Sequence, residues 1–224
     1  FAPTGSVTAR DITAVVSRML NRPINDTAIG VDISSLGTLL RTKIVGQDEV
    51  IATVINTLAK TELGLQREQR PLASFLFAGP TGVGKTEMAK LIATGVYHDA
   101  KALIRIDMSE FSEGFSVSKI LGAPAGYVGH RESTTLVDRL RRQPLSVLVF
   151  DEINRAHPDV LNVLLTMLEE GRLTDASGKE ASVKQAIIIL TVQLASEEVS
   201  GSRFGFAPEI TARTDEHIRR TLYQ

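Results

Sequence analysis

Eight consecutive residues have the types and the spacing needed to bind phosphate. The segment GPTGVGKT, residues 79–86, places Gly79, Gly84, Lys85 and Thr86 at the positions of a phosphate-binding loop. The glycines let backbone N–H groups wrap a phosphate, and the start of a following helix adds partial positive charge. Lys85 would then contact the β- and γ-phosphates of ATP, and the Thr86 hydroxyl would bind Mg²⁺. The residues expected to contact the nucleotide here are Thr81, Gly82, Val83, Gly84, Lys85, Thr86 and Glu87.

Two adjacent acidic residues follow another apolar run. In SVLVFDE, residues 146–152, Asp151 could hold the Mg²⁺ and Glu152 could orient the water that attacks the γ-phosphate. A strand that ends beside the loop can deliver one carboxylate to the metal and its neighbour to the water. The alternative is a helix start whose acidic residues interact with the helix dipole. A glutamate at this position favours hydrolysis of ATP over phosphoryl transfer to a small molecule.

Short apolar runs, most of them followed by a helical pattern, begin at residue 73. They are ASFLFAG, ALIRIDM, SVLVFDE and AIIILT. This alternation predicts an α/β fold with a mostly parallel sheet covered by helices on both faces. Together with the phosphate-binding loop, it predicts a three-layer αβα P-loop NTPase. Because the phosphate-loop segment follows one run and precedes a helical pattern, this context argues against a Gly-rich turn that matches by chance. The runs show no alternation of inward and outward residues, so we expect all of them to be central strands.

Two helices are expected ahead of these runs. TARDITAVVSRML, residues 8–20, has helical spacing, whereas NDTAIGVDISSLGTLL, residues 25–40, is rich in turn formers. The segment GQDEVIATVINTLAKTELGL predicts a helix with one apolar face, formed by Val50, Val54, Ile55 and Leu58. The N-terminal FAPTGSVTAR lacks an initiator Met and a signal pattern, which suggests the start of a fragment.

Composition disfavours several classes of partner. The net charge of −1 gives no field that would attract nucleic acid or an anionic membrane, although DRLRRQP at residues 138–144 is locally basic and reads best as a solvated helix face. The apolar runs are far shorter than the roughly 20 residues that span a bilayer. There is no cysteine, which fits a reducing compartment. We therefore expect a cytoplasmic protein, with an organelle matrix or stroma as the alternative.

Three further features carry weaker signals. The Gly-rich segment GAPAGYVGH, residues 122–130, exposes Tyr127 and Val128, either as contact residues or as buried anchors. GRLTD, residues 171–175, predicts a structural turn after a long helix. The histidines show no metal-ligand spacing, so we expect solvated or capping roles for His98, His130, His157 and His217.

Five segments, in order and spacing, resemble the second ATPase module of the Clp family of AAA+ protein unfoldases. They are FLFAGPTGVGKTEMAK, IRIDMSEFSE, GAPAGYVG, VFDEINRAHPDVLNVLLTMLEEGRLTD and IIILT. The resemblance implies an AAA+ large nucleotide-binding subdomain at residues 39–224, preceded by a linker and helix at residues 1–38. It also implies a hexamer with nucleotide at the subunit interfaces.

The same resemblance implies roles for individual residues. Tyr127 and Val128 would be pore-loop residues that grip an unfolded polypeptide. In KIVGQDEV, Ile44 and Val45 would pack on the adenine. Gln193 stands where the family usually has an asparagine that senses the γ-phosphate, and its extra methylene suggests a slowed or altered hydrolysis step.

Other positions also depart from the family pattern. Ser133 and Thr134 replace paired glycines beside the pore loop, and Asn154 replaces an acidic residue at an expected subunit contact. The chain stops at Gln224, before the family's arginine finger, its fifth strand and its helical lid, so we expect that lid to be absent. The strand at residues 73–78 would then be a sheet edge. We expect weak nucleotide affinity and little ATPase activity from this chain by itself.

The branch of the family is suggested by RFGFAPE, residues 203–209. This segment lies where the protease-partnered members ClpA and ClpC have a loop that docks on a ClpP-type peptidase, and the resemblance favours that branch. The alternatives are a ClpB-type disaggregase, a nucleic-acid motor or loader on the same ATPase core, and a nucleotide-binding scaffold that hydrolyses ATP weakly. The intact Asp151 and Glu152 argue against complete loss of hydrolysis.

Overall fold

A parallel β-sheet organises the molecule, as the sequence predicts. The computed structural model describes Val15 and residues 32–62, 69–122 and 135–194. The sheet has the strand order β1-β6-β3-β2, and each neighbouring pair is parallel. The strands are β1 (Ala73–Gly79), β2 (Leu103–Asp107), β3 (Val147–Asp151) and β6 (Ile187–Gln193). These bounds match the four apolar runs to within one or two residues.

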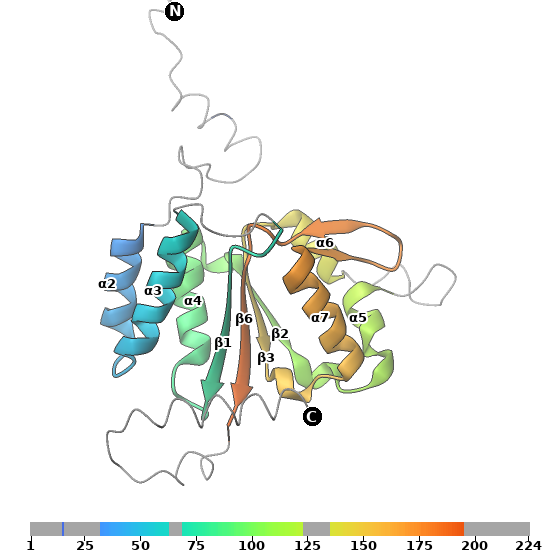
Figure 1. Cartoon of the computed structure of the whole chain (residues 1–224), viewed down its shortest axis with the longest axis horizontal. Coiled ribbons are helices and arrows are strands. Elements are labelled where there is room, and N and C mark those ends of the chain that lie inside the picture. The colour runs from blue at the N-terminus through green and yellow to red at the C-terminus, as the bar shows by residue number, and fades with distance from the viewer. Residues whose placement is uncertain (1–14, 16–31, 63–68, 123–134, 195–224) are drawn as a thin grey trace, which may run out of the picture.

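Helices cover both faces of this sheet. They are α2 (Ile33–Lys43), α3 (Asp48–Glu62), α4 (Lys85–Tyr97), α5 (Val117–Leu121), α6 (Leu136–Arg142) and α7 (Pro158–Glu170). Short 3₁₀ helices join them: η1 (Ala100–Ala102), η2 (Met108–Phe111), η3 (Gly114–Ser116) and η4 (Ile153–Arg155). Figure 1 shows α2, α3 and α4 on one side of the sheet and α5, α6 and α7 on the other.

The hydrophobic core is divided by the sheet into two parts. Along β3, Val147 and Val149 pack with α2, α3 and α4, whereas Leu148 and Phe150 pack with α5, α6 and α7. A strand whose alternate residues face two different helical layers must be apolar at every position, which explains why β3 reads as a continuous run. The three-layer α/β architecture is therefore confirmed.

The prediction that all four runs are central strands is wrong for two of them. Within the residues that the structure describes, β1 and β2 are the edges of the sheet. In β1, Ala73 and Phe75 are buried on the helix-covered face, while Leu76 is 40% exposed. An apolar strand sequence indicates that at least one face of the strand is buried. It does not indicate whether the strand has one neighbour in the sheet or two. The position of β1 agrees with the expectation that residues 73–78 form a sheet edge.

The segment predicted to be rich in turns contains helix α2. Asp32 caps this helix, because its side chain accepts a hydrogen bond from the backbone N–H of Ser35 at 3.1 Å. Leu36 and Leu40 lie one turn apart and are almost fully buried in the core. Tertiary packing of these leucines outweighs the weak local propensity of the serines around them. The predicted domain boundary after residue 38 falls inside α2.

A β-hairpin stands where a simple turn was predicted after α7. Strands β4 (Arg172–Thr174) and β5 (Glu180–Ser182) pair antiparallel. Gly171 ends α7 with a positive φ of 64°, and its N–H donates to the Met167 carbonyl at 3.0 Å. Leu173 and Ala181 are buried, so the hairpin packs on the core beside α6 and α7.

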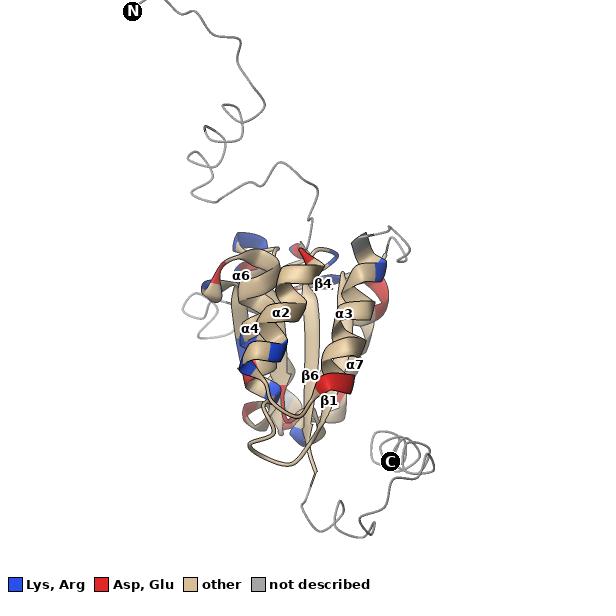
Figure 2. Cartoon of the chain, turned by 90° about the vertical axis from the view of Figure 1, so that its left-hand side faces the viewer, with Lys and Arg blue, Asp and Glu red and all other residues tan. Residues whose placement is uncertain are grey.

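Basic and acidic residues both lie along the helices that face the viewer in Figure 2. The basic segment at residues 138–144 includes Arg139, Arg141 and Arg142, which are exposed in the last turn of α6. Cations are favourable at this end of a helix because the helix dipole is negative there. Among the described residues, no helix combines the length and apolarity needed to cross a membrane.

Several predictions concern residues outside the described ranges. They are the helix at residues 8–20, of which only Val15 is described, the pore-loop residues Tyr127 and Val128, the histidines His130 and His217, the substitutions Ser133 and Thr134, and the segment at residues 203–209.

Candidate nucleotide-binding site

The predicted phosphate loop joins the end of β1 to the start of α4. Gly82 and Gly84 have φ values of 86° and 97°, a region that side-chain-bearing residues rarely adopt. Apart from each glycine and its two chain neighbours, no heavy atom of the described residues lies within 4 Å of the place where a Cβ of either residue would be. The loop therefore forms an open cradle of backbone around the N-terminus of α4, which is the geometry that an anion requires.

Lys85 folds back over this loop. Its Nζ donates hydrogen bonds to the carbonyl oxygens of Gly79 at 2.6 Å and Pro80 at 2.8 Å. Partial burial lowers the pKa of Lys85, while the nearby Asp151 and Glu152 act in the opposite direction. The ammonium group thus lies at the phosphate loop, and its contact with phosphate stays a prediction.

One cavity of about 380 Å³ brings the predicted phosphate and metal residues together. It is lined by Thr81, Gly82, Gly84, Lys85, Thr86, Glu87, Lys90, Arg105, Asp151, Glu152, Thr191 and Gln193. Val83 lines a neighbouring cavity instead. The Thr86 hydroxyl and the Asp151 carboxylate are hard oxygen donors on the same cavity wall, and Mg²⁺ is normally held by few protein oxygens together with phosphates. The donor set therefore fits Mg²⁺ with ATP.

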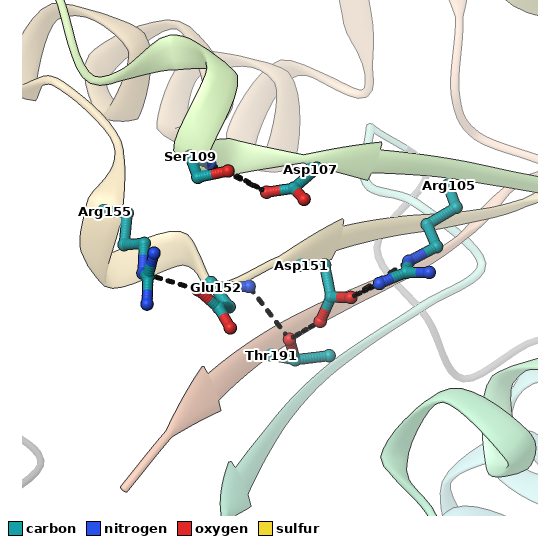
Figure 3. Close-up of polar contacts among 7 residues, drawn as sticks. All are labelled: Arg105, Asp107, Ser109, Asp151, Glu152, Arg155 and Thr191. Atoms are coloured by element: carbon teal, nitrogen blue, oxygen red, sulfur yellow. Dashed lines mark hydrogen bonds and ion pairs between the residues drawn. The ribbon is translucent and has the colours of Figure 1, made fainter. Parts of the chain in front are cut away.

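Both carboxylate oxygens of Asp151 already have partners, as Figure 3 shows. The Thr191 hydroxyl donates to Oδ1. Arg105 donates to Oδ2 through Nε at 2.9 Å and also through Nη2. Asp151 is only 9% exposed, and a buried carboxylate needs such partners. Arg105 was missed by the sequence analysis because only the pairing of β2 with β3 brings it to Asp151.

Glu152 follows β3 in a left-handed conformation with φ of 57°. Its N–H donates to the Thr191 hydroxyl oxygen at 3.0 Å, so one hydroxyl connects both acidic residues. Its carboxylate pairs with Arg155 at 2.5 Å. The exposed fraction of the Glu152 side chain is 27%, which leaves it accessible to water from the cavity.

A second, apolar cavity of about 150 Å³ adjoins the first at Gly84 and Lys85, which line both. It is lined by Ile44, Gln47, Val50, Leu76, Phe77, Ala78, Val83, Gly84, Lys85 and Met88. Ile44 is buried here, whereas Val45 is 90% exposed and is not among the lining residues. A small cavity with a mostly apolar lining suits an aromatic heterocycle.

The apolar residues of this cavity come partly from α3 and α4. Val50 was expected on the core face of α3, but it is 39% exposed and lines the cavity, and Ile51 takes the core position. Met88 lies at the first turn of α4, just beyond Lys85 and Thr86. No spacing rule separates these residues from ordinary core residues, so the sequence could not identify them.

The remaining predicted site residues lie at the edges of the cavity or outside the described ranges. Gln193 ends β6 beside Gly79, its partner in the register of the sheet, and lines the phosphate cavity. Asn154 lies in η4. His157 caps α7 by accepting the Asp159 N–H at 3.3 Å, in line with a capping role. Among the described residues no group of three or more His, Cys, Asp or Glu side chains could hold a metal.

Comparison with known proteins gives matches over nearly the whole chain. Residues 70–223 match the family described as AAA domain (Cdc48 subfamily). The chain is 40% identical over 221 residues to the ATP-dependent Clp protease ATP-binding subunit ClpC of Staphylococcus aureus (strain USA300), covering 97% of the chain and 27% of that protein. It is 42% identical over 212 residues to Chaperone protein ClpC3, chloroplastic, of Oryza sativa subsp. japonica, covering 92% of the chain and 22% of that protein. The chain thus spans about a quarter of the length of these relatives.

Proposed function

The chain belongs to the AAA domain family (Cdc48 subfamily), and from this premise we propose that it binds ATP with Mg²⁺ and hydrolyses it. One observation carries the proposal. The Thr191 hydroxyl joins Asp151 to Glu152 on the wall of the same cavity that the phosphate loop lines. A metal-ligating carboxylate and a water-orienting carboxylate beside a phosphate cradle are two groups that support ATP hydrolysis.

The phosphates would bind to the backbone N–H groups between Thr81 and Glu87 and to Lys85. The charge of Lys85 is held at the loop by its bonds to Gly79 and Pro80, so this group is already positioned before nucleotide binds. Thr86 and Asp151 would hold Mg²⁺, which when bound would neutralise charge that develops on the phosphates.

Glu152 would act as the general base. Its backbone is fixed by the bond to Thr191, and its carboxylate would accept a proton from the attacking water. The pairing with Arg155 holds this carboxylate in the described conformation, and Arg155 is 58% exposed, so the pair can open towards the cavity at small cost. Gln193 would contact the γ-phosphate from the end of β6.

The adenine would bind in the apolar cavity. Ile44, Val50 and Met88 contribute apolar surface, and Gln47 contributes an amide that can both donate and accept hydrogen bonds. Val45, which the resemblance placed on the base, points to solvent in the structure and is left out of this assignment.

At the level of the whole protein, we propose a hexameric ATPase that unfolds and threads polypeptides. Support comes from the 40% sequence identity to ClpC, which is named as an ATP-binding subunit of an ATP-dependent Clp protease. That name favours a ClpP-type peptidase as partner over a ClpB-type disaggregase. Tyr127 and Val128 would grip the polypeptide. The relatives' sources favour a bacterial cytoplasm or a chloroplast stroma as the location.

The proposal is tested by ATP turnover of the natural full-length protein and its Glu152→Gln variant. Loss of the base should lower kcat by at least about a hundredfold. Binding of ADP, measured by calorimetry, should stay within about threefold of the wild-type value, because binding does not need the base. Glu169→Gln, an exposed change on α7, is the matched control and should leave turnover unchanged. Turnover that survives in Glu152→Gln would refute the assignment.

A further inference from the structure

Asp151 has a cation partner of its own within the chain. Oδ2 accepts two hydrogen bonds from Arg105, and Oδ1 accepts one from Thr191. A nearly buried carboxylate is costly without compensating charge, and Arg105 provides that charge when no metal is bound. With both oxygens engaged, a metal ion can reach Asp151 fully only when one partner gives way.

The two partners differ in how easily they can leave. Thr191 is fully buried and also accepts the Glu152 N–H, so moving it would break a second hydrogen bond in the interior. Arg105 extends from β2 into the phosphate cavity, and its side chain is 54% exposed. A guanidinium released there can be solvated by water at once. Arg105 is therefore the partner that would yield.

We infer that Arg105 is the internal counter-ion of Asp151 and competes with a divalent cation for that carboxylate. This inference rests on the proposed function, because only a metal–nucleotide site makes Asp151 a metal ligand. Arg105 is then a positioning residue: it keeps the site electrically balanced in the metal-free state and sets how strongly nucleotide binding depends on metal.

Other charged groups near the site form their hydrogen bonds and ion pairs with other residues. Arg155 pairs with Glu152, and Lys85 bonds to the loop carbonyls while the charges of Asp151 and Glu152 act on it from a distance. Asp107 interacts with both Arg105 and Arg155, but its carboxylate accepts hydrogen bonds from Ser109, which are the main reason why its pKa is lowered. Among the described contacts, Arg105 is the basic residue hydrogen-bonded to Asp151.

Removal of Arg105 should change metal-free and metal-bound states in opposite directions. Without metal, Asp151 would keep only the more distant charge of Lys85 and would repel the phosphates more strongly, so metal-free nucleotide would bind more weakly. With Mg²⁺ present, no guanidinium has to be displaced, so binding would be unchanged or tighter. Both effects raise the ratio of the Kd in EDTA to the Kd in MgCl₂.

The experiment is calorimetric titration of the whole chain with ADP, in EDTA and in MgCl₂. For Arg105→Gln we expect this ratio to rise by about fivefold. This is the expected effect of losing a charge-assisted hydrogen bond, made smaller because the Arg105 side chain is exposed to solvent. Lys90→Gln is the matched control: Lys90 also lines the cavity, but its partner is Glu87 at 3.4 Å, so its ratio should equal that of wild type within the error of the titration. Arg105→Lys keeps the positive charge but loses the planar guanidinium with its paired N–H donors, so its ratio should rise by about twofold.

Each outcome supports or overturns a defined statement. Wild-type chain that binds no ADP in either buffer would refute the proposed function itself. Wild-type binding with an unchanged or lower ratio in Arg105→Gln would overturn the role of Arg105 and leave the proposed function standing. Circular dichroism establishes that each variant is folded. If Arg105→Gln does not fold, the milder Arg105→Lys variant takes its place in the test. An unchanged ratio in that variant would overturn the inference.

Discussion

The hydroxyl of Thr191 fixes the relation between the two acidic residues of the site. It donates to Asp151 and accepts from the backbone of Glu152, so a small, fully buried group sets both positions. Glu152 needs this support because its left-handed backbone is strained by about 1 kcal/mol or more. Backbone strain of this kind is common at functional residues, and it agrees with the proposed catalytic role of Glu152.

Gln193 gives a prediction about the hydrolysis step. It lies at the end of β6 and lines the phosphate cavity, where the longer side chain shifts the amide relative to an asparagine. Gln193→Asn should therefore raise ATP turnover of the natural full-length protein, by about threefold or more, with ADP affinity unchanged. Steady-state kinetics and calorimetry measure the two quantities. Turnover that is indifferent to the exchange would contradict the hypothesis that the longer side chain of Gln193 slows hydrolysis.

The residues of the site divide by whether local sequence could reveal them. The phosphate loop and the pair Asp151 and Glu152 were predictable, because their chemistry requires fixed spacing along one segment. Arg105 and Arg155 were not predicted to pair with these acids. Arg105 reaches Asp151 only through the register of two strands, in which Asp107 lies beside Asp151. Contacts across strands depend on pairing that no single segment encodes.

The same division holds for the elements. The four strands followed from their short apolar runs, and helices α3, α4 and α7 followed from helical patterns, whereas α2 and the β4–β5 hairpin were not predicted. Helix α2 contains two serines, two threonines and a glycine, so its propensity is weak and its leucines provide the stabilisation through packing. Strands β4 and β5 are only three residues long, too short for alternation to be recognised.

The cap of α2 gives a prediction with a defined pH dependence. Hydrogen bonds from Ser35 and Ser34 lower the pKa of Asp32 from 3.8 to about 2. Because the folded pKa is depressed, the cap stabilises the fold above pH 3.8 and this stabilisation is lost as pH falls through about 2. Asp32→Ala should therefore have a lower Tm than wild type at pH 7, by a difference that shrinks over this acidic window.

Asp32→Asn is the control for the cap. Asparagine can accept the same N–H hydrogen bond from Ser35 without a charge, so this variant should retain most of the stability at pH 7. Thermal unfolding followed by circular dichroism measures all three proteins. A Tm for Asp32→Ala equal to wild type at pH 7 would contradict the capping role.

The end of α7 gives a prediction about backbone conformation and close approach. Gly171 and Gly178 both have positive φ, but only at Gly171 would an added Cβ lie 2.5 Å from the carbonyl oxygen of Gln69. Gly178→Ala should lower the free energy of unfolding by about 1 kcal/mol, from backbone strain alone. Gly171→Ala should lower it by about 3 kcal/mol, because the new Cβ would also clash with the backbone of Gln69. Urea unfolding compares the pair, and equal losses would show that the contact with Gln69 is unimportant.

At the scale of the whole molecule, the parallel sheet brings the site together at one edge. The carboxyl ends of β3 and β6 deliver Asp151 and Gln193 to the phosphate cavity, and the loop that follows β1 lines the same cavity from Thr81 onward. Helices α3 and α4 contribute to the apolar cavity beside it. Ligands of open α/β sheets bind at this edge because the connecting loops and helix N-termini converge there. The position of the site is thus a consequence of the fold.

The central claim, that this edge binds a nucleotide through the phosphate loop, is tested most directly by calorimetric titration of the chain with ADP in MgCl₂. Wild-type chain should bind ADP, and Lys85→Ala should bind it at least about tenfold more weakly, since a charge-assisted contact to phosphate is lost. Lys90→Ala, on the same helix and paired with Glu87, should differ from wild type by less than about threefold. No binding by the wild-type chain, or equal affinity of wild type and Lys85→Ala, would contradict the claim.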